Sequence, residues 1–421
     1  MIGHPHTRPG RPAPSMSSRL PPSFTGLAWS NLAAQSAEQL SLAATPIVAV
    51  LMLGAGPGEV GVLATAQTLP FLLLSIPLGL WADRTSRLRM MWWSETLRLL
   101  AFLGLLAVVL AGEVSIALLA VLGCLGAIGT VGFSVTAPAL TPALVPRDQL
   151  AQANGRLELA RSVAFAGGPA LAGSLVAWAG ASAAFVLAAA LSAAALVLLL
   201  RLREPARPRA APRHVMLELR DGAALVWSHP LLRPIFTTSV VWNISWFVLQ
   251  AAYVPYAMRL LGLDASGVGF TLAAYGAGMV VGSLVARRIM GAVAFGHAIA
   301  LGPFVSVLAQ STMVLTLVLP WGVLAGCALF LFGAGPIIWT ITSTTLRQTV
   351  TPDAMLARVS AIFLTGGWGV RPLGAALGGL VGARWGETAC LVLALAGFVL
   401  QAAVIWVSQL RRLQILPAPT A

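Results

Sequence analysis

Glu38, Glu95, Arg98 and Arg371 are ionisable residues that lie inside long apolar stretches of this chain. Placing a charge in such a stretch costs free energy, so the residue usually has a charged partner or a function. A carboxylate there can bind and release a proton, and a guanidinium can hold an anion. These residue types therefore indicate proton or ion binding as the chemistry to look for.

Glu38 lies midway along the first apolar stretch and shares one helical face with Asn31, Gln35 and Thr45. We expect this polar face to point into a central cavity, with Asn31 and Gln35 in contact with a ligand. Glu38 is then a proton-coupling or cation-binding acid. The alternative is a carboxylate that neighbouring polar groups hold for packing.

Glu95 and Arg98 lie one helical turn apart and can pair with each other. They form either a structural ion pair or a second proton-coupling site. Arg371, in the run Gly-Val-Arg-Pro at 369–372, is suited to attract an anionic ligand. It could instead pair with Glu38 or with another acid.

The apolar stretch at 231–261 places Asn243, Trp246, Gln250 and Tyr253 on one helical face. An aromatic and amide lining suits a bulky amphiphilic ligand. The alternative is an aromatic belt at a membrane surface, which explains Tyr253 and Tyr256 better than Asn243.

The composition decides the class of protein that holds these residues. The chain is 58% hydrophobic and 9% charged, whereas a soluble domain carries about 25% charged residues. All 26 basic residues are arginine, and we expect no nucleic-acid partner despite a net charge of +13. Without lysine there is no nucleotide-binding loop, and no nucleophile triad or His/Cys cluster stands out. We therefore expect a polytopic membrane protein that is not an enzyme and holds no cofactor or metal.

Twelve hydrophobic segments are long enough to cross a bilayer, which takes about 20 apolar residues each. We predict an all-α membrane protein with these spans: 24–53, 59–82, 91–112, 115–138, 150–179, 183–201, 231–261, 266–289, 294–318, 321–346, 355–384 and 388–410.

A basic stretch at 203–230 divides the spans into two groups of six. We predict a disordered cytoplasmic tail at 1–22, a first six-helix bundle at 23–202 and a cytoplasmic linker at 203–230. A second bundle at 231–411 and a cytoplasmic tail at 412–421 follow. The linker contains a possible amphipathic helix at 215–227. Arginines gather on one side of the spans, with only Arg259 and Arg384 on the other, so both termini are predicted in the cytoplasm.

The two groups of spans resemble each other in sequence. Gly79 has a counterpart 203 positions later at Gly282, and Gly132 has one at Gly335. Later in each group of spans, equivalent residues are 206 positions apart. This spacing relates the glycines at 168, 173 and 180 to those at 374, 379 and 386. A duplicated six-helix unit places the ligand site near the bilayer midplane, between the two copies.

The connection after the second span carries an unusual combination of residues: Gly79, Asp83, Arg84, Arg87 and Arg89. This segment resembles the signature loop of the major facilitator superfamily of transporters, in which a glycine is followed after three residues by Asp-Arg and then by a further arginine. Serine and leucine replace a glycine and a base of that pattern at positions 86 and 88. The resemblance implies a gating loop on the cytoplasmic side, with Asp83 facing the start of the eleventh span near Arg358.

A second stretch, in the fifth span, resembles the motif of the exporter branch of that superfamily. Gly168, Pro169 and Gly173 match it, while alanines at 164 and 172 replace two glycines. Small residues let membrane helices pack closely, and an ordinary packing face is the alternative interpretation. With the segment at 146–154, the pattern is similar to enterobactin-type siderophore exporters and macrolide efflux pumps.

The resemblance implies a secondary active transporter of the plasma (inner) membrane. It would export a small amphiphilic drug, macrolide or siderophore by proton antiport. Its partners would be a small-molecule substrate, protons and membrane lipids, and we expect a monomer. The alternatives are a lysophospholipid or metabolite carrier of the same fold and a non-transporting membrane sensor or scaffold.

Overall fold

The computed structural model describes residues 20–146, 149–204, 215–352 and 355–417. The predicted tail at 1–22 lies outside these ranges up to residue 19, and the predicted tail at 412–421 lies outside them from residue 418. The described residues form helices and short turns. The helices are α1 Pro22–Leu53, α2 Pro57–Arg84, α3 Arg87–Ala111, α4 Ile116–Leu144, α5 Leu150–Ala179, α6 Ala181–Leu200, α7 Val215–Ser228, α8 Leu232–Arg259, α9 Ala265–Ala292, α10 Phe295–Leu315, α11 Gly322–Val350, α12 Leu356–Gly369, α13 Arg371–Val407 and the 3-10 helix η3 Gln409–Arg412.

Eleven candidate membrane spans are present in the described part of the chain, and one of them is long enough to cross the membrane twice. The last candidate, Arg358–Val407, has 50 residues, or about 75 Å of helix, against a hydrocarbon core of about 30 Å. Gly386 interrupts it with a φ of 79°, in the left-handed region that suits glycine. The segment therefore crosses twice, and the prediction of twelve transmembrane helices is confirmed.

Most predicted boundaries agree with the helices to within a few residues, and two differ more. α4 continues to Leu144, beyond the predicted end at 138. The eleventh span is divided between α12 and the first half of α13, because the helix is interrupted at Val370, just before Pro372. This interruption places Arg371 in the first turn of α13.

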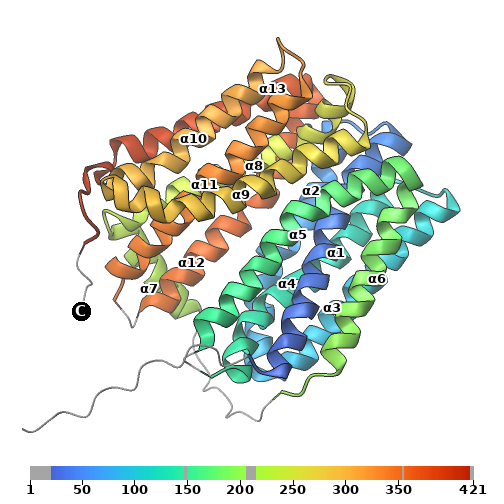
Figure 1. Ribbon diagram of the computed structural model, residues 1–421. Coiled ribbons are helices and arrows are strands. Elements are labelled where there is room, and N and C mark those ends of the chain that lie inside the picture. Colours follow the sequence, from blue (N-terminus) through green and yellow to red (C-terminus); the bar gives the residue numbers. More distant parts are fainter. Residues whose placement is uncertain (1–19, 147–148, 205–214, 353–354, 418–421) are drawn as a thin grey trace, which may run out of the picture.

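The helices form two bundles that stand side by side (Figure 1). α1–α6 make the N-bundle, and α8–α13 make the C-bundle; α7 packs on α12 and α8. Equivalent glycines make equivalent contacts across the seam between them. Gly173 of α5 lies against Gly269 of α9, and Gly379 of α13 lies against Gly61 of α2. The duplication seen in the sequence is therefore a pseudo-symmetry of the fold.

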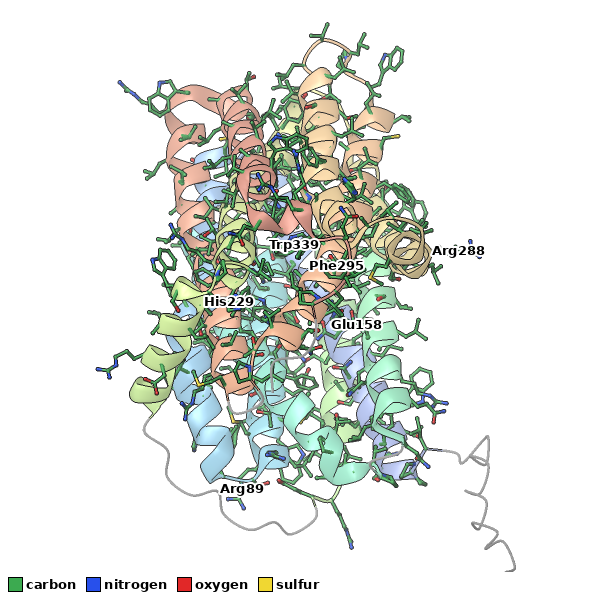
Figure 2. All side chains as sticks on the ribbon, turned by 90° about the vertical axis from the view of Figure 1, so that its left-hand side faces the viewer. Arg89, Glu158, His229, Arg288, Phe295 and Trp339 are labelled. Atoms are coloured by element: carbon green, nitrogen blue, oxygen red, sulfur yellow. The ribbon has the colours of Figure 1, made fainter. Side chains whose placement is uncertain are left out.

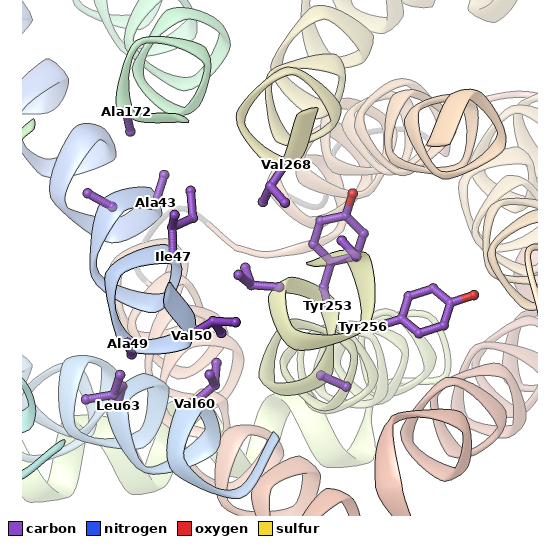
Figure 3. Close-up of a cluster of buried hydrophobic side chains, with 14 of the residues drawn as sticks. Ala43, Ile47, Ala49, Val50, Val60, Leu63, Ala172, Tyr253, Tyr256 and Val268 are labelled. Carbon is purple, nitrogen blue, oxygen red and sulfur yellow. The ribbon is translucent and has the colours of Figure 1, made fainter. Parts of the chain in front are cut away.

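The two ends of the molecule differ in how the bundles meet. We call the end that carries Leu20, Leu202 and α7 the linker end, and the end with the turns at Gly54 and Gly386 the distal end. One buried cluster reaches the distal end and contains side chains of both bundles. Figure 3 shows part of it, with α1, α2 and α5 on one side and α8 and α9 on the other.

At the linker end the buried side chains form two separate clusters. One contains N-bundle residues such as Phe24 and Leu144, and the other contains C-bundle residues such as Ile235 and Val350 together with Val226 of α7. The hydrophobic core thus joins the bundles toward the distal end and leaves them independent at the linker end. The structure is closed at the distal end.

Candidate functional site

A cavity of about 360 Å³ lies between the two bundles, where α1–α5 face α8, α9, α11 and α13. Its size falls in the usual range for small-molecule sites, about 300–1,000 Å³. Charged side chains line it from both bundles: Glu38, Arg98 and Arg161 from the N-bundle and Arg371 from the C-bundle. The cavity therefore combines an apolar wall with a few charged groups.

The acid that faces this cavity is Glu38, whereas Glu95 is hidden behind Arg98. Arg98 forms an ion pair with Glu95, as the sequence predicted, and the hydroxyl of Ser192 donates to Glu95 Oε1 at 2.5 Å. Glu38 is 17% exposed, and its Oε2 lies 3.7 Å from Arg98 Nη1. That distance is longer than a hydrogen bond. Glu95 is thus fully engaged, whereas Glu38 has one longer contact to Arg98 and faces the cavity.

Arg371 faces the cavity from the C-bundle. Its Nε donates to Asn243 Oδ1 at 3.1 Å, and its guanidinium lies 4.7 Å from the centroid of Trp368 and 5.6 Å from that of Phe247. No ion pair among the described residues includes Arg371, so it does not form the direct pair with Glu38 that the sequence left open. The groups in direct contact with its guanidinium are thus one amide and two aromatic rings.

An aromatic stack forms another wall. Trp242 and Trp246 are stacked with their centroids 5.5 Å apart, and Trp246 stacks on Tyr275 at 4.9 Å. Phe332 supports Trp246 from behind at 5.1 Å. All three stacked rings line the cavity, and so do Asn243 and Gln250. A flat apolar surface thus lies next to the polar groups.

Other predicted side chains lie away from this cavity. Asn31 and Gln35 do not line the cavity, although both lie in the described part of the chain. α1 faces the cavity only from Glu38 onward, toward the distal end. Tyr253 and Tyr256 are buried among the C-bundle helices, where their hydroxyls meet Thr271 at 2.5 Å and Thr316 at 2.6 Å. They therefore form no belt at a membrane surface.

Several lining residues were not expected from the sequence, among them Gln67, Arg161 and Tyr275. Arg161 left a usable signal, since it is a charge inside a predicted span. Its partner Glu158 lies three residues earlier, with Arg161 Nη2 2.8 Å from Glu158 Oε1. Gln67 and Tyr275 gave no sequence signal that could have identified them, because single amide and phenol groups are common in such helices.

The glycine motif of α5 makes close helix contacts. A Cβ on Gly168 would lie 2.5 Å from Gln39 Cβ of α1, and one on Gly173 would lie 2.8 Å from Gly269 Cα of α9. Pro169 lines the cavity between these two contacts. Gly168 therefore packs α5 inside the N-bundle, and Gly173 packs it against the C-bundle.

A polar connection also joins the bundles at the distal end. Arg259, the last residue of α8, donates through Nη2 to the carbonyl oxygens of Gly54 and Ala55, the latter at 3.0 Å. Its Nη1 lies 3.5 Å from Glu387 Oε1. Because Gly54 caps α1, a C-bundle cation satisfies the carbonyl end of an N-bundle helix.

Comparisons with known proteins agree with this architecture. The family model of the Major Facilitator Superfamily matches residues 27–375. The chain belongs to the major facilitator superfamily. It is a multi-pass membrane protein, and the superfamily to which it belongs consists of transporters.

Two relatives of known name are similar over part of the chain. An uncharacterized MFS-type transporter, y4rN of Sinorhizobium fredii, is 29% identical over 58% of this chain and 60% of its own length. The enterobactin exporter EntS of Escherichia coli is 29% identical over 58% of each chain. These matches thus span about three fifths of each relative.

Solved transporter structures share the fold at low sequence identity. A bacterial homologue of the lysosomal transporter Spinster, in an inward-facing and unoccupied conformation, has a TM-score of 0.69 at 16% identity and covers 93% of this chain and 96% of its own. An inward-facing bacterial homologue of the iron transporter ferroportin also has a TM-score of 0.69 at 16% identity, with coverage of 90% and 98%. This likeness supports the superfamily fold alone.

The superfamily's signature loop lies at the linker end, between α2 and α3. Ser86, which replaces a glycine of the pattern, caps α3 by accepting the Arg89 N–H at 3.1 Å. Gly79 lies beside Val135 of α4, and Arg89 projects at the linker end (Figure 2). The side chains of Asp83 and Arg84 lie outside the described residues, so the expected approach of Asp83 to Arg358 stays a prediction.

Two further contacts around this loop were not expected from the sequence. Glu204, just after α6, accepts the Ser86 hydroxyl at 2.5 Å and the N–H groups of Arg87 and Leu88 at 3.2 and 3.1 Å. Its carboxylate therefore caps the positive end of α3. Arg358 of α12 forms an ion pair with Asp221 of α7 at 3.3 Å, which ties the linker helix to the C-bundle.

Proposed function

We propose that this protein exports a small amphiphilic molecule across the inner membrane in exchange for protons. The observation that carries the proposal is Glu38. It is the acid in the lining of the interbundle cavity, and it is held only loosely by Arg98. A carboxylate inside a membrane transporter is a natural proton carrier. The similarity to an enterobactin exporter supports export as the direction.

The arginine distribution supports a cytoplasmic location for both termini. The linker end is then cytoplasmic, and the structure, closed at the distal end, is an inward-facing form. In the cycle that we propose, substrate binds from the cytoplasm and the bundles rock so that the distal end opens. A proton from outside then binds to Glu38 as substrate leaves. The protonated form favours the return to the inward-facing state, where the proton is released.

The test uses the purified full chain in proteoliposomes with an imposed pH gradient. Three candidate substrates distinguish the substrate classes: a macrolide, a catecholate siderophore and a lysophospholipid. We expect Glu38→Gln to abolish gradient-driven movement, while substrate binding persists and no longer depends on pH. Glu113→Gln, at an exposed acid of the turn between α3 and α4, is the control and should transport normally. Unchanged proton-coupled transport by Glu38→Gln would refute the proposal.

A further inference from the structure

The two walls of the interbundle cavity carry opposite charges. On the N-bundle side, the carboxylates of Glu38 and Glu95 flank a single guanidinium, Arg98, so this group has one net negative charge when Glu38 is ionised. Arg161 also lines the cavity on that side and forms an ion pair with Glu158, with Arg161 Nη2 2.8 Å from Glu158 Oε1. On the C-bundle side, Arg371 supplies one positive charge without a carboxylate partner among the described residues.

The unused hydrogen-bonding groups follow the same division. A carboxylate can accept about four hydrogen bonds, and Glu38 accepts none from the described residues. Arg371 uses only its Nε, toward Asn243, which leaves the donors of both Nη atoms free within the described part of the chain. Trp242 Nε1, buried beside the cavity, also has no partner there. Acceptors are therefore available on the N-bundle wall, and donors on the C-bundle wall.

These features exclude ligands that carry one kind of charge. A cation would suit Glu38 but would meet Arg371 across the cavity, and an anion would meet the ionised Glu38. A neutral ligand would leave Arg371 without a charged partner and Glu38 with only the longer contact to Arg98, which is costly when the ligand displaces water from these groups. A ligand that carries both charges satisfies both walls.

We propose that the substrate is a zwitterion with an aromatic body. Its cationic group binds Glu38, its anionic group binds Arg371 and Trp242 Nε1, and its ring lies along the stack of Trp242, Trp246 and Tyr275. The inference rests on the proposed function only in taking the interbundle cavity as the substrate site. It names the substrate class that the proposed function leaves open.

The zwitterion also supplies a reason for exchange with protons. Its cationic group and a proton bind the same carboxylate, so each displaces the other. The charged groups that face Glu38 are Arg98 and Glu95 of α3, Arg161 of α5 and Arg371 of α13. We therefore expect one proton to be released when the zwitterion binds to protonated Glu38.

Four derivatives of 2-naphthylalanine, with one ring system and different charges, test this inference. They are the free amino acid, its methyl ester, its N-acetyl acid and its N-acetyl amide. Binding is measured by calorimetry on the full chain in lipid nanodiscs without any gradient. A ligand that makes one more charge-assisted hydrogen bond binds with about tenfold higher affinity. We expect the zwitterion to bind about tenfold more tightly than either singly charged form, and the neutral form to bind most weakly.

Two variants assign each charge to its residue. Glu38→Gln should remove the about tenfold preference for a free amine and keep the preference for a carboxylate, and Arg371→Gln should do the opposite. Glu113→Gln and Arg384→Gln remove exposed charges at the distal end and should leave all four affinities unchanged. Acidification should weaken binding of the zwitterion and not of the N-acetyl acid, and Glu38→Gln should remove this difference.

The inference is overturned if the ester or the N-acetyl acid binds the unaltered protein as tightly as the zwitterion does. It is also overturned if both variants weaken all four ligands equally, since the residues would then act only on packing. Failure of proton antiport is a separate outcome. It would appear as transport that ignores the pH gradient, with the ligand preferences intact.

Discussion

Replacing Gly173 with alanine should open the distal end of the molecule. A Cβ at this position would collide with the Ala265 carbonyl oxygen and lie 2.8 Å from Gly269 Cα and 3.0 Å from Gly269 N. These are backbone atoms, so the collision is relieved only if α9 moves away from α5. The contact belongs to the form that is closed at the distal end, and the substitution therefore destabilises that form selectively.

The magnitude follows from the cost of overpacking, about 1–3 kcal/mol, because the gain that alanine brings to a helix is the same in both forms and cancels from their ratio. A cost of about 1–3 kcal/mol shifts the ratio of closed to open forms by roughly 5- to 150-fold. Gly167 on the same helix offers the matched control. A Cβ there meets no atom within 4 Å, so Gly167→Ala should leave the ratio unchanged.

Spin labels at the distal end measure this ratio. Cysteines replace the exposed residues Glu113 of the N-bundle and Trp321 of the C-bundle, after the native cysteines 124, 327 and 390 have been removed. The distribution of distances between the labels should gain a longer population in Gly173→Ala. An unchanged distribution, or the same gain in Gly167→Ala, would refute the idea that glycine contacts at the seam set the balance.

Three further outcomes are expected. Arg259→Gln removes the hydrogen bonds to Gly54 and Ala55, so it should lengthen the same label distances, though less than Gly173→Ala; unaltered distances would contradict this. Glu204→Gln weakens the cap of α3 by about 1 kcal/mol, so the amides of Arg87 and Leu88 should exchange hydrogen about fivefold faster, whereas amides in the middle of α3 should not. His229 lies outside the membrane spans, where burial lowers the pKa of its ring and Nδ1 accepts N–H groups from the start of α8. Its stabilising effect is present above its ordinary pKa of about 6.5 and is lost as the pH falls through the lowered value, so unfolding midpoints should drop below pH 6.5 and drop less in His229→Gln.

Local patterns made much of this architecture predictable. An apolar stretch of about 20 residues fixes a spanning helix with little help from its neighbours, because the backbone satisfies its own hydrogen bonds. The pair of Glu95 and Arg98 was predictable for a similar reason, since three residues make one helical turn. The glycine repeats indicated two related bundles, because both copies carry close helix contacts at the same positions.

Other features depended on which helices meet. Arg371 and Asn243 are 128 positions apart, and Glu95 and Ser192 are 97 apart, so no local period connects them. Asn31 and Glu38 share a helical face, yet Glu38 lines the cavity whereas Asn31 is buried outside its lining. Glu204 has no partner in its own segment, and its capping role arises only where the end of α6 meets the start of α3.

The sequence by itself therefore determined the class, the spans, the duplication and the presence of buried charges, since each follows from composition or from a period of a few residues. The tertiary structure alone decided that Glu38 of one bundle and Arg371 of the other line the same aromatic cavity. Side chains far apart in the chain converge there only because two bundles pack against each other at one end.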